Sequence, residues 1–267
     1  MVDTTTDAIL RFLNAHGSVR RYTDQPVTDE QLDRIIEIAQ RAPTSSNMQA
    51  YSIIVVRDPQ KKAALSVLSG NQPHVRDCPV LLVFCPDLLR LRKICLEAGY
   101  RFREEYFEYL LVAVVDAAVA GQNALLAAEA LGLGACMIGG LRNRPQEVSD
   151  LLNLPPRVFA LFGMTLGVPH KPMQAKLRLP AKVIRHDEQY GMETMEEGLA
   201  EYDRTMKQTG IYRGRRVELE DIGHDLIEKF TEEDYGWLEH TARRLANPAS
   251  ARPDLKPFLT AKKFGFL

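Results

Sequence analysis

The start of the chain carries apolar positions at the spacing of two amphipathic helices. One helix is predicted from Thr5 to Ala15, where apolar side chains recur every three or four residues. A second helix is predicted to begin at Thr28, because Thr28 and Gln31 have the spacing of a capping box. Pro43 ends this second segment.

Short apolar runs further along the chain predict the strands of a sheet. Residues 51–58 and 79–87 are rich in β-branched side chains and are bounded by proline or aspartate, which is typical of buried strands. Two further strands are predicted at 134–141 and 157–169. A short helix between the first two strands ends at Gly70. This mixture of helices and strands indicates an α+β fold.

The longest predicted element runs from Phe107 to Leu131 and is apolar on nearly every side. Such a helix is buried on several sides, so it belongs at the centre of the domain or in an interface between subunits. Polar residues interrupt it, which argues against a membrane span. These residues are Asp116, Gln122, Asn123 and Glu129.

The chain changes character after Pro180. Residues 191–246 have the pattern of polar helices with little strand signal. The end of the chain is predicted to be an extended tail that finishes on Phe264, Phe266 and Leu267. We therefore expect a core over residues 1–190 and a helical extension with a tail over residues 191–267, both parts of one domain.

Composition narrows the class of protein. Of the 267 residues, 45% are hydrophobic and 26% are charged, as in an ordinary globular protein. The formal net charge of -1 argues against nucleic-acid binding, which normally shows as a basic excess. The four cysteines form no CxxC pair and no zinc-like spacing, so we expect reduced thiols and no metal site. No secretory signal is visible, and a cytoplasmic protein without membrane association is expected.

Familiar catalytic signatures are missing: the chain has no GxSxG, no HExxH and no Walker loop. The glycines around residue 134 do not form a dinucleotide fingerprint, because they follow a helix and precede a strand. Polar or glycine-rich stretches remain, each of which is by itself typical of a solvated turn. They are HGSVRR (16–21), PTSSNMQ (43–49), IGGLR (138–142) and KLRLP (176–180).

Two of these stretches have the chemistry of a cofactor site. Glycines beside a strand end, as at Gly139 and Gly140, let backbone N–H groups approach a flat ligand closely. Lys176 and Arg178 point the same way along an extended segment, so both cations can reach one phosphate.

Taken together and in order, these stretches resemble the flavin-dependent nitroreductase superfamily. The resemblance is to its branch of NADPH-dependent, oxygen-insensitive nitroreductases and NADPH–flavin oxidoreductases. HGSVRRYTDQPV resembles the HRSxRxFxxxPI opening of that family, and SGNQPHV, GLGACMIGGLRN and LFGMTLGVP follow in family order. The likeness runs from about residue 10 to residue 216 and is weaker beyond.

This resemblance implies a nitroreductase-like architecture. A central, mainly antiparallel sheet of four or five strands would have helices on both faces, in an intertwined homodimer. The long helices would form the subunit interface, and FMN would bind between the subunits. The C-terminal tail fits this expectation, since a lone chain would leave its phenylalanines exposed.

The resemblance also assigns the contacts of FMN. His16 and Ser18 would meet the phosphate and the ribityl chain, and Arg20 would lie at the pyrimidine end of the ring. A cation there suits the negative charge that hydride transfer to N5 leaves at N1. Gly17, in the same loop, stands where the family usually has arginine. The remaining predicted contacts are Ser45, Ser46, Asn47, Gln49, Gln72, Met137, Gly139, Gly140, Lys176 and Arg178.

A second basic cluster, YRGRRVELED (212–221), resembles the segment that binds the 2′-phosphate of NADPH in this branch. Arg213 matches best, and Arg215 and Arg216 are further candidates, since the planar donor fork of arginine suits phosphate. The alternative is a solvated loop whose charges are balanced by neighbouring acids. These acids are Glu218, Glu220 and Asp221.

The implied activity is a ping-pong reaction with NADPH as co-substrate and FMN as cofactor, in which no side chain acts as a catalytic group. A nitroaromatic, a quinone or a related small molecule would accept two electrons. Two alternatives stay open: a dedicated NADPH–flavin reductase that supplies free reduced flavin, and a flavin-binding or sensing protein with slow turnover. The arginines at 213–216 argue against the latter, because a flavin holder needs no contact with a pyridine nucleotide.

Overall fold

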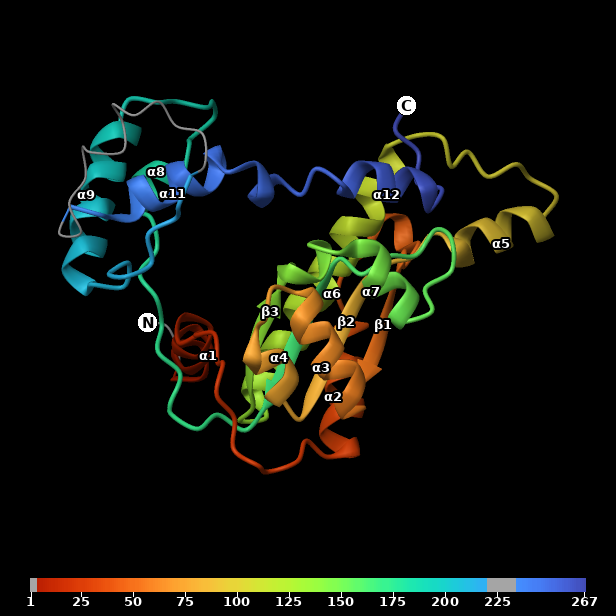
Figure 1. Ribbon diagram of the computed structural model, residues 1–267, viewed down its shortest axis with the longest axis horizontal. Helices are drawn as coiled ribbons and strands as arrows, with labels where there is room; N and C mark the ends of the chain where they lie inside the picture. The colour runs from red at the N-terminus through yellow and green to blue at the C-terminus, as the bar shows by residue number, and fades with distance from the viewer. Residues whose placement is uncertain (1–3, 220–233) are drawn as a thin grey trace. The chain divides into compact units, whose positions relative to one another are not determined.

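The computed structural model describes residues 4–219 and 234–267. The chain divides into two compact units (Figure 1): unit 1 comprises Met1–Ala175 and Asp254–Leu267, and unit 2 comprises Lys176–Pro253. The division falls before Lys176, ahead of the position near residue 190 expected from the sequence. The end of the chain returns to unit 1.

Unit 1 is built on a four-stranded sheet with the order β1-β2-β4-β3, in which every neighbouring pair is antiparallel. Its strands are β1 (Tyr51–Val56), β2 (Val80–Pro86), β3 (Gly134–Ile138) and β4 (Phe162–Gly167). β2 is buried along its whole length, since it has a strand on either side and helices on both faces. The predicted α+β fold with an antiparallel sheet is confirmed.

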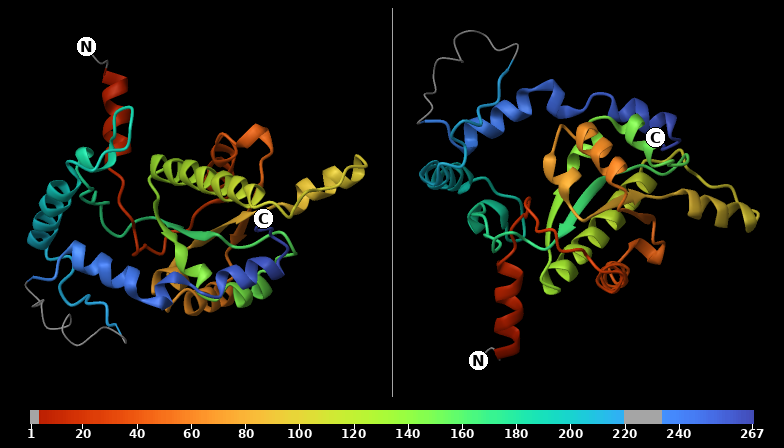
Figure 2. Two further views of the ribbon diagram at one scale, coloured as in Figure 1. Left: turned by 90° about the horizontal axis from the view of Figure 1, so that it is seen from above. Right: turned by 60° about the horizontal axis from the view of Figure 1, so that its bottom comes forward.

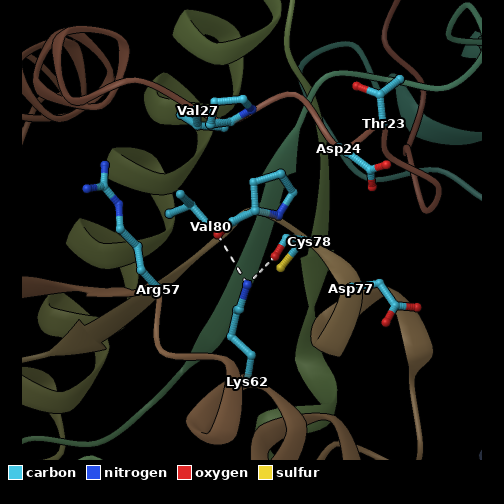
Figure 3. Close-up of a pocket in the computed structure, with 10 residues that line it drawn as sticks. Thr23, Asp24, Val27, Arg57, Lys62, Asp77, Cys78 and Val80 are labelled. Carbon is cyan, nitrogen blue, oxygen red and sulfur yellow. Dashed lines mark hydrogen bonds between the residues drawn. The ribbon is translucent and has the colours of Figure 1, made fainter.

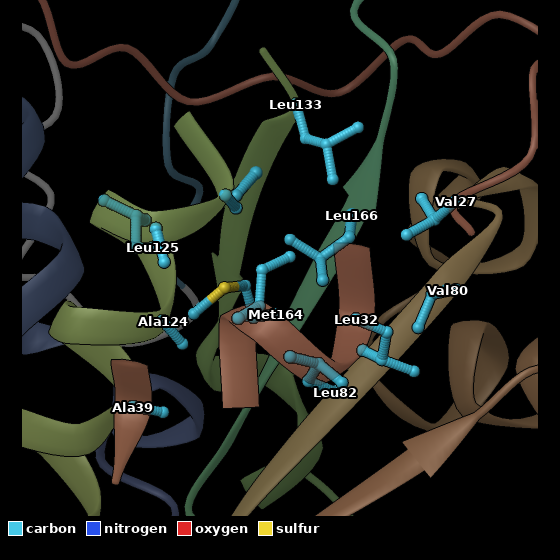
Figure 4. Packing of buried hydrophobic residues seen from close by; sticks show 14 of the residues in the cluster. Val27, Leu32, Ala39, Val80, Leu82, Ala124, Leu125, Leu133, Met164 and Leu166 are labelled. Carbon is cyan, nitrogen blue, oxygen red and sulfur yellow. The ribbon is translucent and has the colours of Figure 1, made fainter. Parts of the chain in front are cut away.

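One face of the sheet packs against α2 (Asp29–Ala39) and α6 (Glu108–Ala130). The side chains between them form the core of Figure 4, in which Leu82 is fully buried. α2 begins with the predicted capping box: the Gln31 N–H donates to Thr28 Oγ1 at 3.1 Å, and the Thr28 N–H donates to Gln31 Oε1 at 3.0 Å.

The opposite face packs against three shorter helices, so the sheet lies between two helical layers (Figure 2). They are α3 (Pro59–Leu68), α4 (Pro73–Asp77) and α7 (Pro145–Leu151). Leu81 and Val83 of β2 face this side, because successive side chains of a strand point in opposite directions.

α6 is the predicted long central helix, with buried residues along most of its length. By length and composition alone it could cross a membrane, but it also packs on the sheet as the core helix of a globular domain does. Asp116 and Glu129 are almost completely buried in it, with exposed fractions of 1% and 6%. Burial of a carboxylate is costly unless it is paired, so the partners of these two acids matter for the site.

α1 (Thr4–Asn14) and α5 (Leu89–Glu97) differ from the other helices of unit 1, because neither contains a buried residue. α1 was predicted within a residue at each end. Both helices extend away from the sheet (Figure 2). They carry apolar side chains that are 44–56% exposed, namely Ile9, Leu10, Leu13, Ile94 and Leu96.

The end of the chain is not the extended tail expected from the sequence. It forms α12 (Leu255–Ala261), after which the Phe264 N–H donates to the Leu259 carbonyl oxygen at 3.0 Å. Phe258 and Phe264 are buried within the same chain, and Phe264 meets Phe159 edge-on with centroids 5.2 Å apart. The expectation that a lone chain would expose the phenylalanines of its tail is wrong for Phe264, which this turn directs into the core of unit 1. Phe266 is half-buried, and its ring centroid lies 5.8 Å from that of Phe107.

Unit 2 is helical in its described part, as the polar pattern predicted. Its helices are α8 (Ala181–Ile184), α9 (Met195–Thr209), α11 (Trp237–Ala246) and the 3-10 turn η3 (Pro248–Ala251). Asp203 joins α9 to α11: it accepts from the Leu238 N–H at 2.8 Å and pairs with Lys207 at 3.1 Å. Residues 220–233 of the predicted extension lie outside the described residues.

Candidate functional site

The loop after α1 is anchored along β3 and β4. The Val19 N–H donates to the Ala135 carbonyl oxygen at 2.8 Å. The Tyr22 hydroxyl donates to the Val19 carbonyl oxygen at 2.7 Å and lies 2.6 Å from Thr165 Oγ1. Gly134 permits this approach, because a Cβ there would overlap Val19. Burial raises the pKa of Tyr22, so its hydroxyl stays protonated and remains a donor at neutral pH.

The predicted FMN contacts of this loop have different environments. Ser18 and Arg20 are exposed, whereas the His16 side chain is 30% exposed. His16 Nδ1 lies 2.6 Å from Glu129 Oε1 of α6, and the Glu129 side chain is 1% exposed. Glu129 is not among the site residues predicted from the sequence, in which it stands out as an acid within an otherwise apolar helix.

Gly17 is buried against the backbone of Gln174. A Cβ at position 17 would overlap the Gln174 carbonyl oxygen, so the arginine usual at this place in the family has no room. Gly17 therefore contributes close packing in this loop, and the segment around Gln174 lies directly on it.

The second predicted FMN segment follows α2. Residues 45–47 form a 3-10 turn, and the predicted contacts from 45 to 49 are exposed. Ser46, Asn47 and Gln49 have left-handed φ values of 48°, 56° and 53°. L-residues rarely adopt this conformation, and it persists where surrounding contacts hold the backbone in place.

Asp116 of α6 supplies those contacts. Its Oδ1 accepts from the Ser45 N–H at 3.0 Å, and its Oδ2 accepts from the Ala50 N–H at 2.9 Å. One carboxylate therefore holds both ends of the segment. The sequence shows Asp116, like Glu129, as a polar interruption of an apolar helix. It does not show that Asp116 bonds to the segment at 45–50.

Gln72 lies against the glycines that follow β3. Gln72 Nε2 donates to the Ser69 carbonyl oxygen at 2.7 Å, and a Cβ at Gly140 would lie 2.6 Å from this same nitrogen. That Cβ would also overlap the Ser69 carbonyl oxygen, so position 140 requires glycine. Gly139 and Gly140 begin a 3-10 turn, and Met137 on β3 is 40% exposed. The structure thus brings the predicted contacts at Gln72 and Gly140 together.

His74 follows Gln72 closely in the sequence and carries a buried polar atom. Its Nε2 is buried and has no hydrogen-bond partner in the part of the chain that the structure describes. Burial, and next the positive charge of Arg20, lower the pKa of His74, against a smaller opposite effect of Asp77. Among the residues of the SGNQPHV stretch, His74 was not among the predicted contacts.

Lys176 and Arg178 open unit 2 on a segment with neither helix nor strand, and both are exposed. Arg178 donates to the Leu177 carbonyl oxygen at 3.5 Å, and this oxygen also accepts from the Tyr202 hydroxyl at 3.1 Å. The role of these two cations toward a phosphate stays a prediction.

The second basic cluster forms tight turns within unit 2. Gly210 and Gly214 have φ values of 64° and 65°, and the Arg213 N–H donates to the Gly210 carbonyl oxygen at 3.1 Å. Arg213 and Arg215 are exposed, and Arg216 is half-buried. Of the acids expected to balance them, Glu218 is exposed, whereas Glu220 and Asp221 lie outside the described residues.

A pocket of about 490 Å³ lies apart from the predicted contacts, none of which lines it (Figure 3). Lys62 in this pocket is buried, and its Nζ donates to the carbonyl oxygens of Cys78 at 2.5 Å and Pro79 at 3.2 Å. Burial raises the pKa of the Cys78 thiol to about 12, so it is not a reactive thiolate at neutral pH. Both polar groups therefore have structural roles here.

Comparison with known proteins identifies the family of the chain. The Nitroreductase family model matches residues 13–168, and the model of the nitroreductase family's C-terminal domain matches residues 176–267. The FMN reductase (NADPH) of Bacillus subtilis is 41% identical over 218 residues, which are 80% of this chain and 85% of that protein. The oxygen-insensitive NADPH nitroreductase of Salmonella typhimurium is 42% identical over 205 residues, 77% of this chain and 83% of that protein.

The fold is shared as well. The solved structure of a nitroreductase from Bacillus subtilis has a TM-score of 0.84 and 36% identity, and covers 96% of this chain and 98% of its own. The two family models meet near the boundary between units 1 and 2. The chain belongs to the nitroreductase family.

Proposed function

We propose that this protein is an NADPH-dependent FMN oxidoreductase that delivers two electrons at a time to small-molecule acceptors. The observation that carries the proposal is the joint placement in unit 1 of an amide and a glycine turn beside β3. Gln72 Nε2 lies within 2.6 Å of where a Cβ at Gly140 would be. The relatives named FMN reductase and NADPH nitroreductase support the same chemistry.

The residues present suit FMN. His74 Nε2 is a buried polar atom without a protein partner among the described residues, so it can bond to a ligand. When bound, FMN supplies a redox centre that takes a hydride from NADPH and gives two electrons to the acceptor. We propose that the predicted FMN contacts bind and orient the cofactor. They are His16, Gly17, Ser18 and Arg20 of the first loop, Ser45, Ser46, Asn47 and Gln49 of the second segment, and Gln72, Met137, Gly139, Gly140, Lys176 and Arg178.

Arg213, Arg215 and Arg216 are proposed to bind the 2′-phosphate of NADPH. Two of the three arginines, Arg213 and Arg215, are exposed, and neighbouring arginines suit a doubly charged phosphate. Unit 1 would then bind most of the FMN, and the arginines of unit 2 would bind the nucleotide.

The proposal includes a homodimer. α1 and α5 have no buried residues yet carry exposed apolar side chains, and Leu111 and Val115 of α6 are 45% and 56% exposed. A second copy of this chain would cover these faces. We also expect a soluble protein in the cytoplasm, where its four cysteines remain reduced thiols.

The direct test is the colour of the purified full-length protein. We expect a yellow protein whose visible flavin absorbance bleaches when NADPH is added without oxygen and returns when an acceptor is added. A colourless protein, or a yellow one that NADPH does not bleach, would contradict the proposal. Steady-state rates with nitrofurazone, a quinone and free FMN then separate a broad reductase from a dedicated flavin reductase.

A further inference from the structure

Helix α6 carries three acids, of which two are buried and bonded to segments predicted to hold FMN. Asp116 accepts from the N–H groups of Ser45 and Ala50, and Glu129 pairs with His16. The third acid, Glu108, is exposed at the start of the helix. We infer that Asp116 and Glu129 are positioning residues of the flavin site, each acting through the segment it holds. This inference rests on the proposed function.

Asp116 is suited to hold the second segment in shape before the cofactor arrives. Both of its oxygens are used, one at each end of a stretch with three left-handed residues. Hydrogen bonds to an ionised acceptor are stronger than neutral ones, which offsets the strain of those residues. An asparagine in its place would keep one oxygen acceptor but would turn an NH₂ group toward the other backbone N–H.

Glu129 is suited to fix the orientation of His16. The two ring nitrogens of histidine point in different directions, so engaging Nδ1 with a carboxylate leaves Nε2 free for another partner. The His16 side chain is 30% exposed, whereas that of Glu129 is 1% exposed. The carboxylate therefore lies behind the ring, and it acts on a ligand through the imidazole.

The sequence distances explain why α6 has this role. His16 and Glu129 are 113 residues apart, and Asp116 is 71 residues from Ser45. Each bond joins a loop to the same helix, which packs on the sheet. A single helix thus sets the positions of two loops that are distant in sequence.

The test measures the dissociation constant of FMN from the full-length holoprotein on dilution, by recovery of flavin fluorescence. We expect Asp116→Asn and Glu129→Gln each to raise it about tenfold or more, as for loss of a hydrogen bond to a charged group. Glu108→Gln makes the same chemical change on the same helix at an exposed position, so it should leave the constant within about twofold. Wild-type affinity in both buried variants would overturn the inference.

A double-mutant cycle separates positioning from general stability. If Glu129 acts through His16, then Glu129→Gln should cause no further loss of FMN affinity in a His16→Ala background. The full loss in that background would show that Glu129 acts by another route and would overturn its assignment.

A measurement on the wild type keeps the Asp116 assignment testable even if its variant does not fold. Hydrogen exchange of the Ser45 and Ala50 amides is followed with and without FMN. Protection that is already present without FMN supports a segment held in place by Asp116. Protection that appears only with FMN overturns this role. A wild-type protein that binds no FMN would instead refute the proposed function, and the inference with it.

Discussion

Gly17 and Gly140 each lie where a Cβ would overlap a backbone carbonyl oxygen of another segment. In both places a missing side chain lets two loops approach each other, and in both places one of the loops belongs to the candidate site. Position 17 shows why a departure from the family pattern can be consistent with the family's fold. The arginine that is absent there would occupy space that Gln174 fills in this chain.

Gly17→Ala should therefore destabilise the protein. We expect a loss of about 1–3 kcal/mol in the free energy of unfolding, as for overpacking of a tight contact, together with weaker FMN binding. Urea denaturation measures the first and flavin fluorescence the second. Ala15→Ser, at an exposed position in the same loop, is the control. An unchanged free energy of unfolding would show that the Gln174 segment moves away without cost.

His74 gives a prediction for pH dependence. Its pKa in the folded protein lies below the ordinary value of 6.5, chiefly because of burial. As the pH falls through that value, the unfolded chain takes up a proton that the folded chain does not, so acid favours unfolding. The stability contribution of neutral His74 is thus present above pH 6.5 and is lost below it.

We expect the free energy of unfolding of the FMN-free protein to fall between about pH 8 and about pH 5.5, and to fall less in His74→Gln. Chemical denaturation at each pH measures both. His170→Gln removes an exposed histidine as the control. If His74→Gln retains the full decline of the wild type, the imidazole is not held neutral by its surroundings.

At the scale of elements, α6 and the 210–216 turns show two ways of placing functional groups. α6 uses buried acids to hold loops that are remote in sequence. The turns use left-handed glycines at 210 and 214, which need no tertiary partner to project arginine side chains. The glycines and arginines of the turns can be recognised in the sequence. The partners of the buried acids of α6 become visible only in the fold.

Arg213→Ala should raise KM for NADPH while leaving the kinetics with NADH nearly unchanged. The two nucleotides differ in the 2′-phosphate, and a contact from an exposed arginine is worth about 1–2 kcal/mol. That corresponds to roughly five- to thirtyfold in kcat/KM for NADPH, and added salt should reduce the preference in the wild type. Arg204→Ala removes an exposed arginine from α9 as the control. Equal losses with both nucleotides would identify the cluster as a solvated loop.

In the whole molecule, some apolar segments are covered within the chain and others are left exposed. The C-terminal phenylalanines Phe258 and Phe264 are covered within their own chain, so they no longer argue for a partner. A partner is instead indicated by α1, α5 and one side of α6, because their apolar side chains are exposed in a single chain. The expected role of the long helix in a homodimer thus gains support from its exposed residues, and the expected role of the tail does not.

Val115→Glu should weaken the homodimer. Val115 is 56% exposed on α6, and a charge buried in an interface without a partner costs several kcal/mol. We expect light scattering at micromolar concentration to give a dimer for the wild type and a larger monomer fraction for the variant. Leu245→Glu, at a position 80% exposed on α11, should leave the mass unchanged. A wild-type monomer that still holds FMN would contradict the proposed assembly.

The elements whose signals are local could be predicted from the sequence. The capping box at Thr28, the four strands and the long helix are all present, and the first two strands and the helix lie close to their predicted bounds. The last strand begins at Phe162, five residues later than predicted. The family also followed from the sequence, because its motifs are short segments in a recognisable order. The prediction of an extended tail was wrong because the local pattern gives the positions of Phe258 and Phe264 but not the residues that they pack against.

Tertiary structure alone decided the contacts between segments that are far apart along the chain. The bond of His16 to Glu129, the hold of Asp116 on the second segment and the packing of Gly17 on Gln174 all join such segments. An acid in an apolar helix indicates that it has a partner, because burying a carboxylate unpaired is costly. Which partner it has depends on how the sheet and helices bring the loops together, and that is settled by packing over the whole of unit 1.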